Sequence, residues 1–399
     1  MTARVRPALM GWSQARRSAT EIAAPVARSR IALAEAGGAT LGEPLRALAA
    51  LPGYRAAAMD GYAVAGPGPW HVAGRALAGR EVPGETLREG TAIEVATGAE
   101  VPRDATAILP YEESRCAGDV VTGVVEPGRH IRSREEVCAA GEELLPAGTV
   151  VTPAVLGLAA SVGHEEVLAR HPSVAVLITG DELADVGLPG PGHVRDALGP
   201  LLPGFIGGIG GRPIAATRVS DRHHALSEAL AEARADVVVC CGASSAGPAD
   251  HLRAVFAEQG ADVRVDGVAC RPGHPQLLSL LPDGRVVIGL PGNPYAAIAA
   301  ALTLLAPVLH SLAGRVEEAP ERAHLVDEAG AADGAGKVAA HPCDTRLLAV
   351  RRDGWGGAVP VGHNRPGGLR GVALADALAV VPPEWSAGAV ELLPIPGSC

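Results

Sequence analysis

Three short runs of apolar residues, each followed by a loop of small and polar residues, restrict most strongly how this chain can fold. The runs are SVAVLIT, DVVVCC and RVVIGL, which end at Thr179, Cys241 and Leu290. Each is followed along the chain by a segment with a helical pattern. Strands without polar alternation are buried on both faces, and strands that alternate with helices form parallel sheets. Residues 171–314 are therefore predicted to form a doubly wound α/β domain.

The regions on either side of this domain have a different pattern. With 399 residues the chain is too long for a single hydrophobic core, so several domains are expected. A helix is predicted from about Gly11 to Ala36. Between residues 51 and 132, short β-rich runs alternate with Gly and Pro turns, which predicts a small β domain. After a polar linker at residues 315–335, the strand-rich tail predicts a small β-barrel.

Charge and apolar pattern exclude several classes of partner. The formal net charge is −10 and no Arg cluster is dense enough to cover a nucleic-acid backbone, so no nucleic-acid binding is expected. The N-terminus lacks an apolar core of signal-peptide length. The longest apolar run, residues 296–309, is interrupted by Pro307 and is too short to span a membrane. The protein is therefore predicted to be soluble and cytoplasmic, with its seven scattered cysteines reduced and mostly buried.

The loops after the three apolar runs are the first candidate site. In an open α/β sheet, ligands bind outside the carboxyl ends of the strands, and glycines there let backbone amides approach a ligand closely. Asp181 and Glu182, together with Asp250, could bind Mg²⁺, which prefers oxygen ligands and often bridges to substrate phosphates. The turn RPGHP carries two potential cations, Arg271 and His274, toward an anion.

Each of these loops also has a purely structural interpretation. Asp181 could cap the following helix. Pro291 and Pro294 could shape a turn, with Pro294 starting a helix. For any one loop the structural interpretation is the stronger, but their joint occurrence after three successive strands favours a ligand site.

Several short motifs resemble those of one enzyme family. They are AMDGYAV at residues 58–64, TGA at 97–99 followed by VP at 101–102, PAGT at 146–149, TGDEL at 179–183, ADVV at 235–238 with the loop at 242–250, and LPGNP at 290–294. A single motif would be a weak signal, but the combination is specific. The order and spacing of the motifs match the pattern of that family from about residue 8 to the C-terminus. The chain thereby resembles the MoeA family of molybdenum cofactor biosynthesis, which includes the E domain of gephyrin.

The resemblance implies a multidomain α/β plus β architecture. It assigns an elongated helical and β linker domain to residues 1–50 and 134–170, an inserted β domain carrying AMDGYAV to 51–133, the α/β molybdopterin-binding domain to 171–314 and a C-terminal β-barrel to 315–399. It also implies a homodimer, with a cleft between the α/β domain of one subunit and the AMDGYAV domain of the other.

The reaction that the resemblance implies is that of a molybdopterin molybdenumtransferase. The substrates would be adenylated molybdopterin and molybdate, with Mg²⁺ as the cofactor. The adenylate would be hydrolysed, with release of AMP, as molybdenum enters the dithiolene. Further partners would be a molybdopterin adenylyltransferase and recipient molybdoenzymes.

The loops and the resemblance together define the candidate site residues. The catalytic candidates are Asp60, Glu182, Asp236 and Asp250, of which Glu182 and Asp250 would also bind the metal. The substrate-binding candidates are Thr97, Gly98, Asp181, Gly242, Ser244, Ser245, Arg271, His274, Pro291, Gly292, Asn293 and Pro294. Among these, Arg271 would attract the oxyanion.

Some positions depart from the family's motifs and leave two other functions open. Arg271 and His274 stand where the family has two lysines in KPGKP. YRAA at residues 54–57 replaces FDNS, and RDAL at 195–198 retains only the Asp of YDTN. The loss of these polar groups would fit a diverged paralog that binds a pterin or an anion without turnover. The other alternative is adenylylation of molybdopterin, which proteins of the same α/β fold perform.

Overall fold

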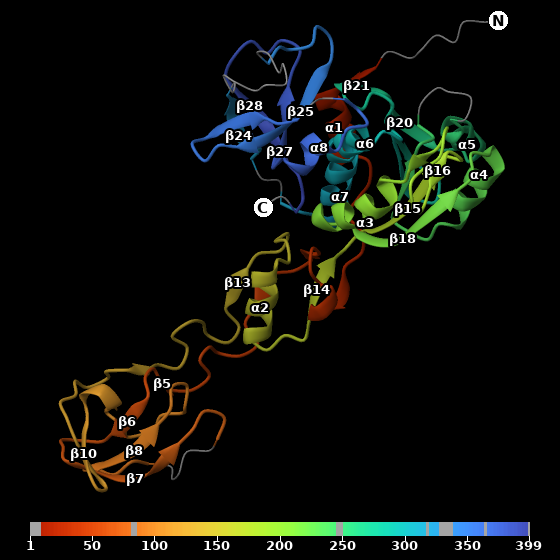
Figure 1. The fold of residues 1–399 in the computed structure, drawn as a ribbon. Helices are drawn as coiled ribbons and strands as arrows, with labels where there is room; N and C mark the ends of the chain where they lie inside the picture. The colour runs from red at the N-terminus through yellow and green to blue at the C-terminus, as the bar shows by residue number, and fades with distance from the viewer. Residues whose placement is uncertain are drawn as a thin grey trace, which may run out of the picture. The chain divides into compact units, whose positions relative to one another are not determined.

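The computed structural model describes residues 9–80, 86–244, 250–316, 319–326, 338–362 and 365–397 (Figure 1). The chain divides into two compact units. One comprises Met1–Glu43, Ala147–Thr152 and Leu168–Cys399, and the other comprises Pro44–Pro146 and Pro153–Val167. The first unit contains the α/β sheet and the C-terminal barrel, and the second contains small β sheets.

The predicted apolar strands form the centre of the α/β sheet. Its order is β18-β15-β19-β23-β22-β20, with bounds Arg212–Val219, Ser173–Thr179, Val237–Cys241, Val286–Leu290, Leu277–Leu280 and Asp262–Asp266. The first four strands in this order are parallel. β22 and β20 are antiparallel to their neighbours, so the sheet is mixed at this edge. The short connection between β22 and β23 leaves no room for the crossover helix that a parallel pair requires.

Alternate residues of the central strands face two separate hydrophobic cores. In β19, Val237, Val239 and Cys241 belong to one core, and Val238 and Cys240 belong to the other. The helices are α1 (Trp12–Thr20), α3 (Leu198–Gly208), α4 (His223–Glu232), α5 (Leu252–Glu258), α6 (Pro294–Ala300), a π-helical turn (Ala301–Leu305) and α7 (Ala306–Ala313). The first core includes residues of α1, α3 and the helix from α6 to α7, and the second includes residues of α4 and α5. Burial on both faces explains why these strands lack polar alternation.

The N-terminal helix is shorter than the sequence predicts. α1 ends at Thr20 rather than near Ala36, and strand β2 (Ser29–Ala32) follows it. Pro25 lies between the two elements. Because proline lacks a backbone N–H, it cannot continue the hydrogen bonds of a helix.

The edge strand β18 has no apolar run that would predict it. All of its residues except Val219 are exposed. Its position depends on backbone pairing with β15, and such pairing leaves no apolar signature in the sequence.

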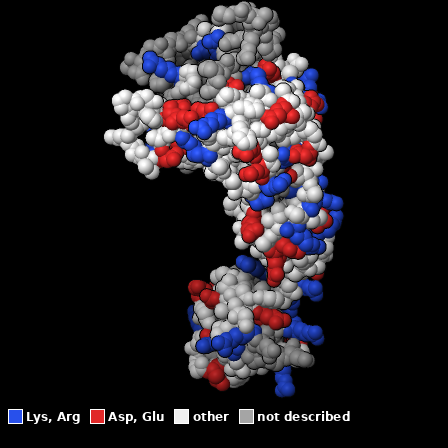
Figure 2. Space-filling view, turned by 90° about the vertical axis from the view of Figure 1, so that its right-hand side faces the viewer, with Lys and Arg blue, Asp and Glu red and all other residues white. Residues whose placement is uncertain are grey.

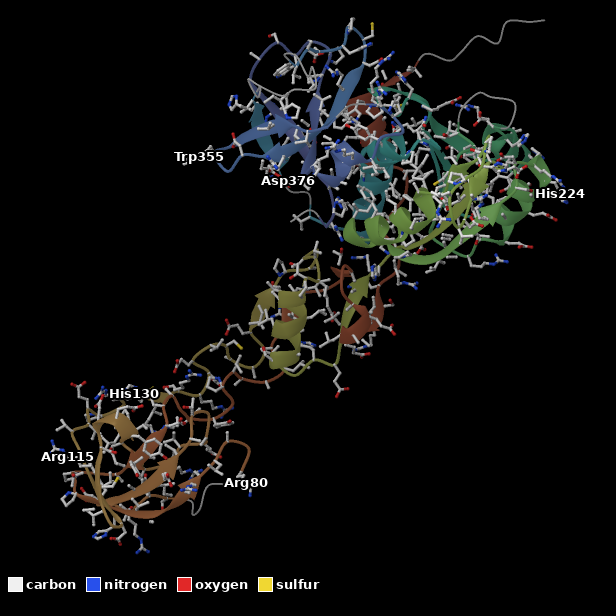
Figure 3. The ribbon with its side chains drawn as sticks, viewed as in Figure 1. Arg80, Arg115, His130, His224, Trp355 and Asp376 are labelled. Carbon is white, nitrogen blue, oxygen red and sulfur yellow. The ribbon has the colours of Figure 1, made fainter. Side chains whose placement is uncertain are left out.

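The predicted C-terminal β-barrel is present. Among the described residues, β24 (Arg322–Leu325), β25 (Thr345–Arg352), β26 (Gly357–Pro360), β27 (Ala377–Val381) and β28 (Ala389–Pro394) pair in a closed cycle. The short helix α8 (Arg370–Ala373) precedes β27. Trp355, labelled in Figure 3, lies in the turn between β25 and β26 and is exposed. Strand β21 (Val268–Arg271) pairs with β25, and β1 (Met10–Gly11) pairs with β21, so the barrel sheet continues into the α/β region.

The second unit is built from short strands. One sheet has the order β10-β11-β7-β8-β6-β9, with bounds Arg115–Ala117, Val120–Thr122, Trp70–Ala76, Thr91–Val95, Gly61–Val64 and Ala107–Pro110. Two smaller pairs are β5 (Ala56–Ala57) with β12 (Ile131–Arg132), and β4 (Leu45–Arg46) with β13 (Glu143–Leu145). The unit also contains α2 (Pro153–Ser161). The remaining short elements of the chain are β3 (Thr40–Leu41), β14 (Glu166–Arg170), β16 (Leu183–Ala184), β17 (Val194–Arg195) and the 3₁₀ turns Leu33–Glu35 and Tyr111–Glu113.

The continuous helix Pro294–Ala313 is long and apolar enough, by length and composition, to cross a membrane. However, 89% of its most apolar window is buried inside the fold. It therefore serves as the central core helix of the α/β region.

Charged side chains of both signs are interspersed on the face shown in Figure 2. Ion pairs such as Arg46–Glu143 and Arg75–Glu94 have short N–O distances of 2.6 Å, but they lie at the surface and contribute little to stability. His224, labelled on α4 in Figure 3, has a side chain that is 83% exposed and pairs with Glu228. The imidazole of His224 is therefore solvated.

Tyr295 connects the core helix to the barrel. Its side chain is fully buried, and its hydroxyl donates to the carbonyl of Leu347 at 2.7 Å. The same oxygen accepts a hydrogen bond from the amide of Ala349 at 3.0 Å. One phenol thus satisfies two buried backbone groups of β25.

We expect Tyr295→Phe to lower the free energy of unfolding by about 1–3 kcal/mol, because a buried amide and a buried carbonyl would each lose a partner. Thermal denaturation of the purified variant measures this as a lower Tm. The matched control is Tyr54→Phe, since Tyr54 is exposed and donates to Gly98 at the surface. Equal Tm values for the two variants would contradict the assigned role of Tyr295.

Candidate functional site

The strand order places a topological switch point between β15 and β19. From β15 the chain passes first to β18 on one side and then to β19 on the other. At such a point the loops at the carboxyl ends diverge and leave a crevice for a ligand. The loops that diverge here are the TGDE segment after β15 and the segment that begins at Gly242 after β19.

The loops after β15, β19 and β23 lie in direct contact. Thr179 donates its hydroxyl hydrogen bond to the carbonyl of Cys241 at 3.0 Å. A Cβ on Gly242 would lie 2.6 Å from the carbonyl oxygen of Thr179, and the φ of Gly242 is +95°, so only glycine fits there. A Cβ on Gly292 would lie 3.5 Å from the Cα of Gly242. The structure thus brings together the predicted loops of all three strands.

The acidic residues of these loops have different surroundings. The backbone N–H of Asp181 donates to the Asp221 carboxylate at 3.0 Å, and the backbone N–H of Asp221 donates to the Asp181 carboxylate at 3.2 Å. Asp181 therefore holds together the loops that follow β15 and β18. Glu182 is exposed, and no group in the described part of the chain bonds to its carboxylate. Asp250 is half-buried, whereas Ser245 lies outside the described residues.

A metal at this edge would have few protein ligands. Within the described ranges, no group of three or more His, Cys, Asp or Glu side chains is arranged to hold a metal ion. Glu182 and Asp250 are oxygen donors, which suits Mg²⁺, an ion that keeps several waters and binds through one or two carboxylates plus substrate phosphates. This donor set is consistent with a magnesium ion that binds together with its substrate.

A pocket of about 350 Å³ lies beside the end of β15. It is lined by Ile178, Asp185, Arg195, Asp196, Gly199, Pro200, Ala216, Thr217 and Arg218. Asp196 accepts hydrogen bonds from the amides of Leu198 and Gly199 at 3.0 Å each and so caps α3. Arg218 donates to the carbonyls of Gly180 and Leu183 and supports the TGDE loop. Sequence analysis missed Arg218 because it belongs to β18, a strand without an apolar signature.

The amides at the start of α6 already have a partner. The N–H groups of Tyr295 and Ala296 both donate to the carbonyl of Pro366, at 3.0 and 3.2 Å. These donors are therefore not available to a phosphate, although a helix N-terminus often binds one. Pro294 stands at the first turn of the helix, as the structural interpretation of LPGNP predicts, while Gly292 and Asn293 are exposed.

Arg271 and His274 of the RPGHP turn contact a carboxylate of the same chain. Arg271 donates through Nε to Oδ2 of Asp344 at 2.6 Å, and His274 Nε2 lies 3.1 Å from the same oxygen. His341 Nδ1 lies 3.3 Å from it. Burial tends to raise the pKa of Asp344, but the hydrogen bonds from Arg271 and His274 outweigh this effect and lower the pKa below its usual value. The carboxylate is therefore ionised at neutral pH.

Within the second unit, Asp60, Thr97 and Gly98 come together. The Asp60 carboxylate accepts hydrogen bonds from the backbone N–H of Thr97 at 2.6 Å and from its hydroxyl at 2.9 Å. The backbone N–H, followed by the hydroxyl, lowers the pKa of Asp60. Gly98 has a φ of +81° in the adjoining turn. The AMDGYAV and TGA motifs thus form one exposed carboxylate site that is ionised at neutral pH.

Asp236 and Ser244 have structural contacts. Asp236 directly precedes β19, at the amino end of the strand. The candidate loops follow the opposite, carboxyl ends of the strands. Its carboxylate accepts from the backbone N–H of Ser173 at 2.7 Å and from the Ser173 hydroxyl at 2.6 Å. Ser244 is buried, and its hydroxyl donates to the carbonyl of Pro275 at 2.6 Å. These positions favour a structural role over catalysis or substrate binding.

We expect Asp236→Ala to lower the free energy of unfolding by about 1–3 kcal/mol, because the half-buried Ser173 donors would lose a charged acceptor. Asp60→Ala should lower the Tm less, because the Thr97 donors that it leaves without a partner are exposed and can bond to water. Thermal denaturation of the two variants in parallel makes the comparison. An unchanged Tm for Asp236→Ala would restore Asp236 as a functional candidate.

Comparison with known proteins agrees with this geometry. A family model described as "MoeA N-terminal region (domain I and II)" matches residues 10–163, and one described as "Probable molybdopterin binding domain" matches residues 175–311. The chain is 35% identical over 317 residues to "Molybdopterin molybdenumtransferase 2" of Mycobacterium tuberculosis, covering 74% of this chain and 77% of the relative. It is 31% identical over 297 residues to the molybdopterin molybdenumtransferase of a Nostoc species, covering 70% of this chain and 68% of the relative.

A solved structure with a similar fold is the molybdopterin biosynthesis MoeA protein of Pyrococcus horikosii. It aligns with a TM-score of 0.71 at 25% sequence identity. The alignment covers 98% of this chain and 100% of the other. The likeness therefore extends over the whole chain, including the barrel that neither family model matches.

Proposed function

The chain belongs to the MoeA family, and from this premise we propose that it inserts molybdenum from molybdate into adenylated molybdopterin. The relatives from Mycobacterium tuberculosis and Nostoc carry the name of this transferase, and the chain spans more than two thirds of each. The observation that carries the proposal is the contact between the loops after β15, β19 and β23 at the switch point. A switch point at the carboxyl ends of the strands is where open α/β sheets bind nucleotide-like, phosphate-bearing ligands.

The reaction divides into two chemical tasks. Water must cleave the phosphoanhydride bond of adenylated molybdopterin, so that AMP leaves and the other phosphate stays on molybdopterin. Molybdate must then bind the two dithiolene sulfurs, with one of its oxygens leaving as water that takes up the two thiol protons. Asp60, held ionised by Thr97, can accept a hydrogen bond from a water or a substrate hydroxyl and orient it.

We propose Glu182 and Asp250 as the ligands of the Mg²⁺ cofactor. Two carboxylates would leave the remaining positions to substrate phosphate oxygens and water. When bound, the ion would neutralise part of the phosphate charge. The exposed, unpaired carboxylate of Glu182 supports this assignment.

One observation supports the alternative of a pterin- or anion-binding protein without turnover. Asp344 neutralises Arg271 and contacts His274, which weakens the attraction of the RPGHP turn for an oxyanion. The adenylyltransferase alternative has less support, because the match to the MoeA N-terminal region covers residues 10–163, outside the α/β domain that would perform that reaction.

Location and further partners are also proposed. The cysteines in the described ranges are free thiols, which fits the cytoplasm, a reducing compartment. We expect a homodimer that receives its substrate from a molybdopterin adenylyltransferase and delivers the product to molybdoenzymes.

Release of AMP from adenylated molybdopterin should require Mg²⁺ and be stimulated by molybdate. Glu182→Ala and Asp250→Ala should each reduce the rate by 100-fold or more, an order-of-magnitude expectation for loss of an electrostatic contact (roughly 10²–10³). Chromatography of AMP after incubation measures this. Glu228→Ala, which removes an exposed carboxylate on α4, is the matched control and should keep wild-type activity. Full activity in both site variants would show that the metal assignment is wrong.

Mixed dimers test the proposed homodimer. If each active site combines Asp60 of one subunit with Glu182 of the other, inactive Asp60→Ala and Glu182→Ala proteins should regain about a quarter to a half of the activity once subunits exchange, because a mixed dimer has one intact site. Light scattering checks assembly, and AMP release checks recovery. A monomeric mass, or no recovery after verified exchange, would refute the shared site.

A further inference from the structure

Backbone pairing holds Arg271 and His274 of the RPGHP turn close to the carboxylate of Asp344. Asp344 directly precedes β25, where Thr345 pairs with Cys270 and Arg346 pairs with Arg271. This register places the carboxylate beside the turn. Its side chain is only 8% exposed, compared with 55% for Arg271 and 34% for His274. The carboxylate is thus buried beneath Arg271 and His274, whose side chains remain partly exposed to solvent.

Arg271 uses only part of its guanidinium for this contact. Its Nε bonds to Asp344, and within the described residues its two terminal nitrogens have no hydrogen-bond partner. Since guanidinium has five N–H donors in a fixed plane, it can contact a second anion while it keeps the first. An oxyanion at this turn would therefore share Arg271 with Asp344.

Within this cluster the permanent charge of Arg271 is balanced by the ionised carboxylate of Asp344. The other titratable groups that face the carboxylate are His274, His341 and Cys270. Burial raises the pKa of Cys270 to about 12, so this thiol is neutral. His341 Nδ1 also lies 3.0 Å from the backbone N–H of Asp344, from which it can accept when neutral.

We propose that Asp344 is a specificity-determining residue that attenuates the binding of dianions at Arg271 and His274. Its fixed charge repels a bound oxyanion in proportion to the charge of that anion. The site therefore discriminates less between monoanions and dianions than Arg271 and His274 would without the carboxylate. The inference rests on the proposed function in one respect: molybdate, or the phosphate of the adenylated substrate, is taken to be the anion.

The test compares two tetrahedral oxyanions of similar size and different charge, molybdate (−2) and perrhenate (−1). Asp344→Asn keeps the shape of the side chain and removes its charge. It should tighten molybdate binding by roughly tenfold, because a unit charge a few ångströms from a dianion is incompletely screened. Perrhenate binding should tighten only about threefold, since the electrostatic free energy scales with the charge of the anion. Isothermal titration calorimetry with each salt measures both dissociation constants.

Two further variants control for charge and for shape. Glu321→Gln removes a carboxylate from the same barrel, where Glu321 pairs with Arg352 at 2.6 Å, and should change neither dissociation constant. Asp344→Glu keeps the charge and should not tighten molybdate binding. Three results would each overturn the proposal. They are equal tightening of molybdate and perrhenate binding in Asp344→Asn, the same tightening in Glu321→Gln, and weaker anion binding in Asp344→Asn. The last result would mean that Asp344 positions Arg271 for binding.

A measurement on the wild-type protein keeps the proposal testable if Asp344→Asn does not fold. The Nε–H resonance of Arg271, assigned by its loss in Arg271→Gln, should shift when molybdate is added, because the guanidinium is then shared between two anions. An unchanged resonance at saturating molybdate would refute the proposal. None of these measurements uses turnover. Failure of the AMP-release assay would therefore not contradict this inference, and failure of these binding experiments would not contradict the proposed reaction.

Discussion

Burial of both faces of the central strands is the constraint on which the rest of the α/β region depends. Because alternate residues of β15, β19 and β23 face two apolar cores, polar groups can occur only where the strands end. Helices must cover both faces, and the crossover connections must return to the same edge of the sheet. Polar side chains that could bind a ligand are therefore concentrated in a few loops. Their mutual contact requires glycine at position 242, where any larger side chain would collide with Thr179.

The C-terminal barrel takes part in shaping these loops. β21 pairs with β25, so a strand from the α/β region is bonded into the barrel sheet. The barrel region in turn supplies the Pro366 carbonyl to the first amides of α6 and the Asp344 carboxylate to the RPGHP turn. Both contacts satisfy polar groups that a bare α/β domain would present to a ligand. The barrel thus modifies the electrostatics of the candidate site as well as stabilising the core helix through Tyr295.

Local sequence patterns predicted the parts of this structure that local physics determines. The runs ending at Thr179, Cys241 and Leu290 are apolar because their strands are buried twice, and the three strands are present. Strand order depends on backbone pairing between distant segments, so neither the edge strand β18 nor the switch point could be predicted. The partner of Arg271 lies 73 residues away and likewise has no local signal. Motif resemblance nominated Asp236, but only the geometry shows its contact with Ser173.

Arginine at position 271, where the family has a lysine, has a physical explanation in its contact with Asp344. A lysine ammonium is a compact point charge with all its donors on one nitrogen, so a carboxylate as close as that of Asp344 would occupy the same atom that an anion has to contact. A guanidinium spreads its donors over a plane, so Arg271 can bond to Asp344 through Nε and still offer its terminal nitrogens to a ligand. Arginine at 271 and aspartate at 344 are therefore compatible with anion recognition as a pair. The pair would keep the directional hydrogen bonding that an oxyanion requires while it reduces the net charge.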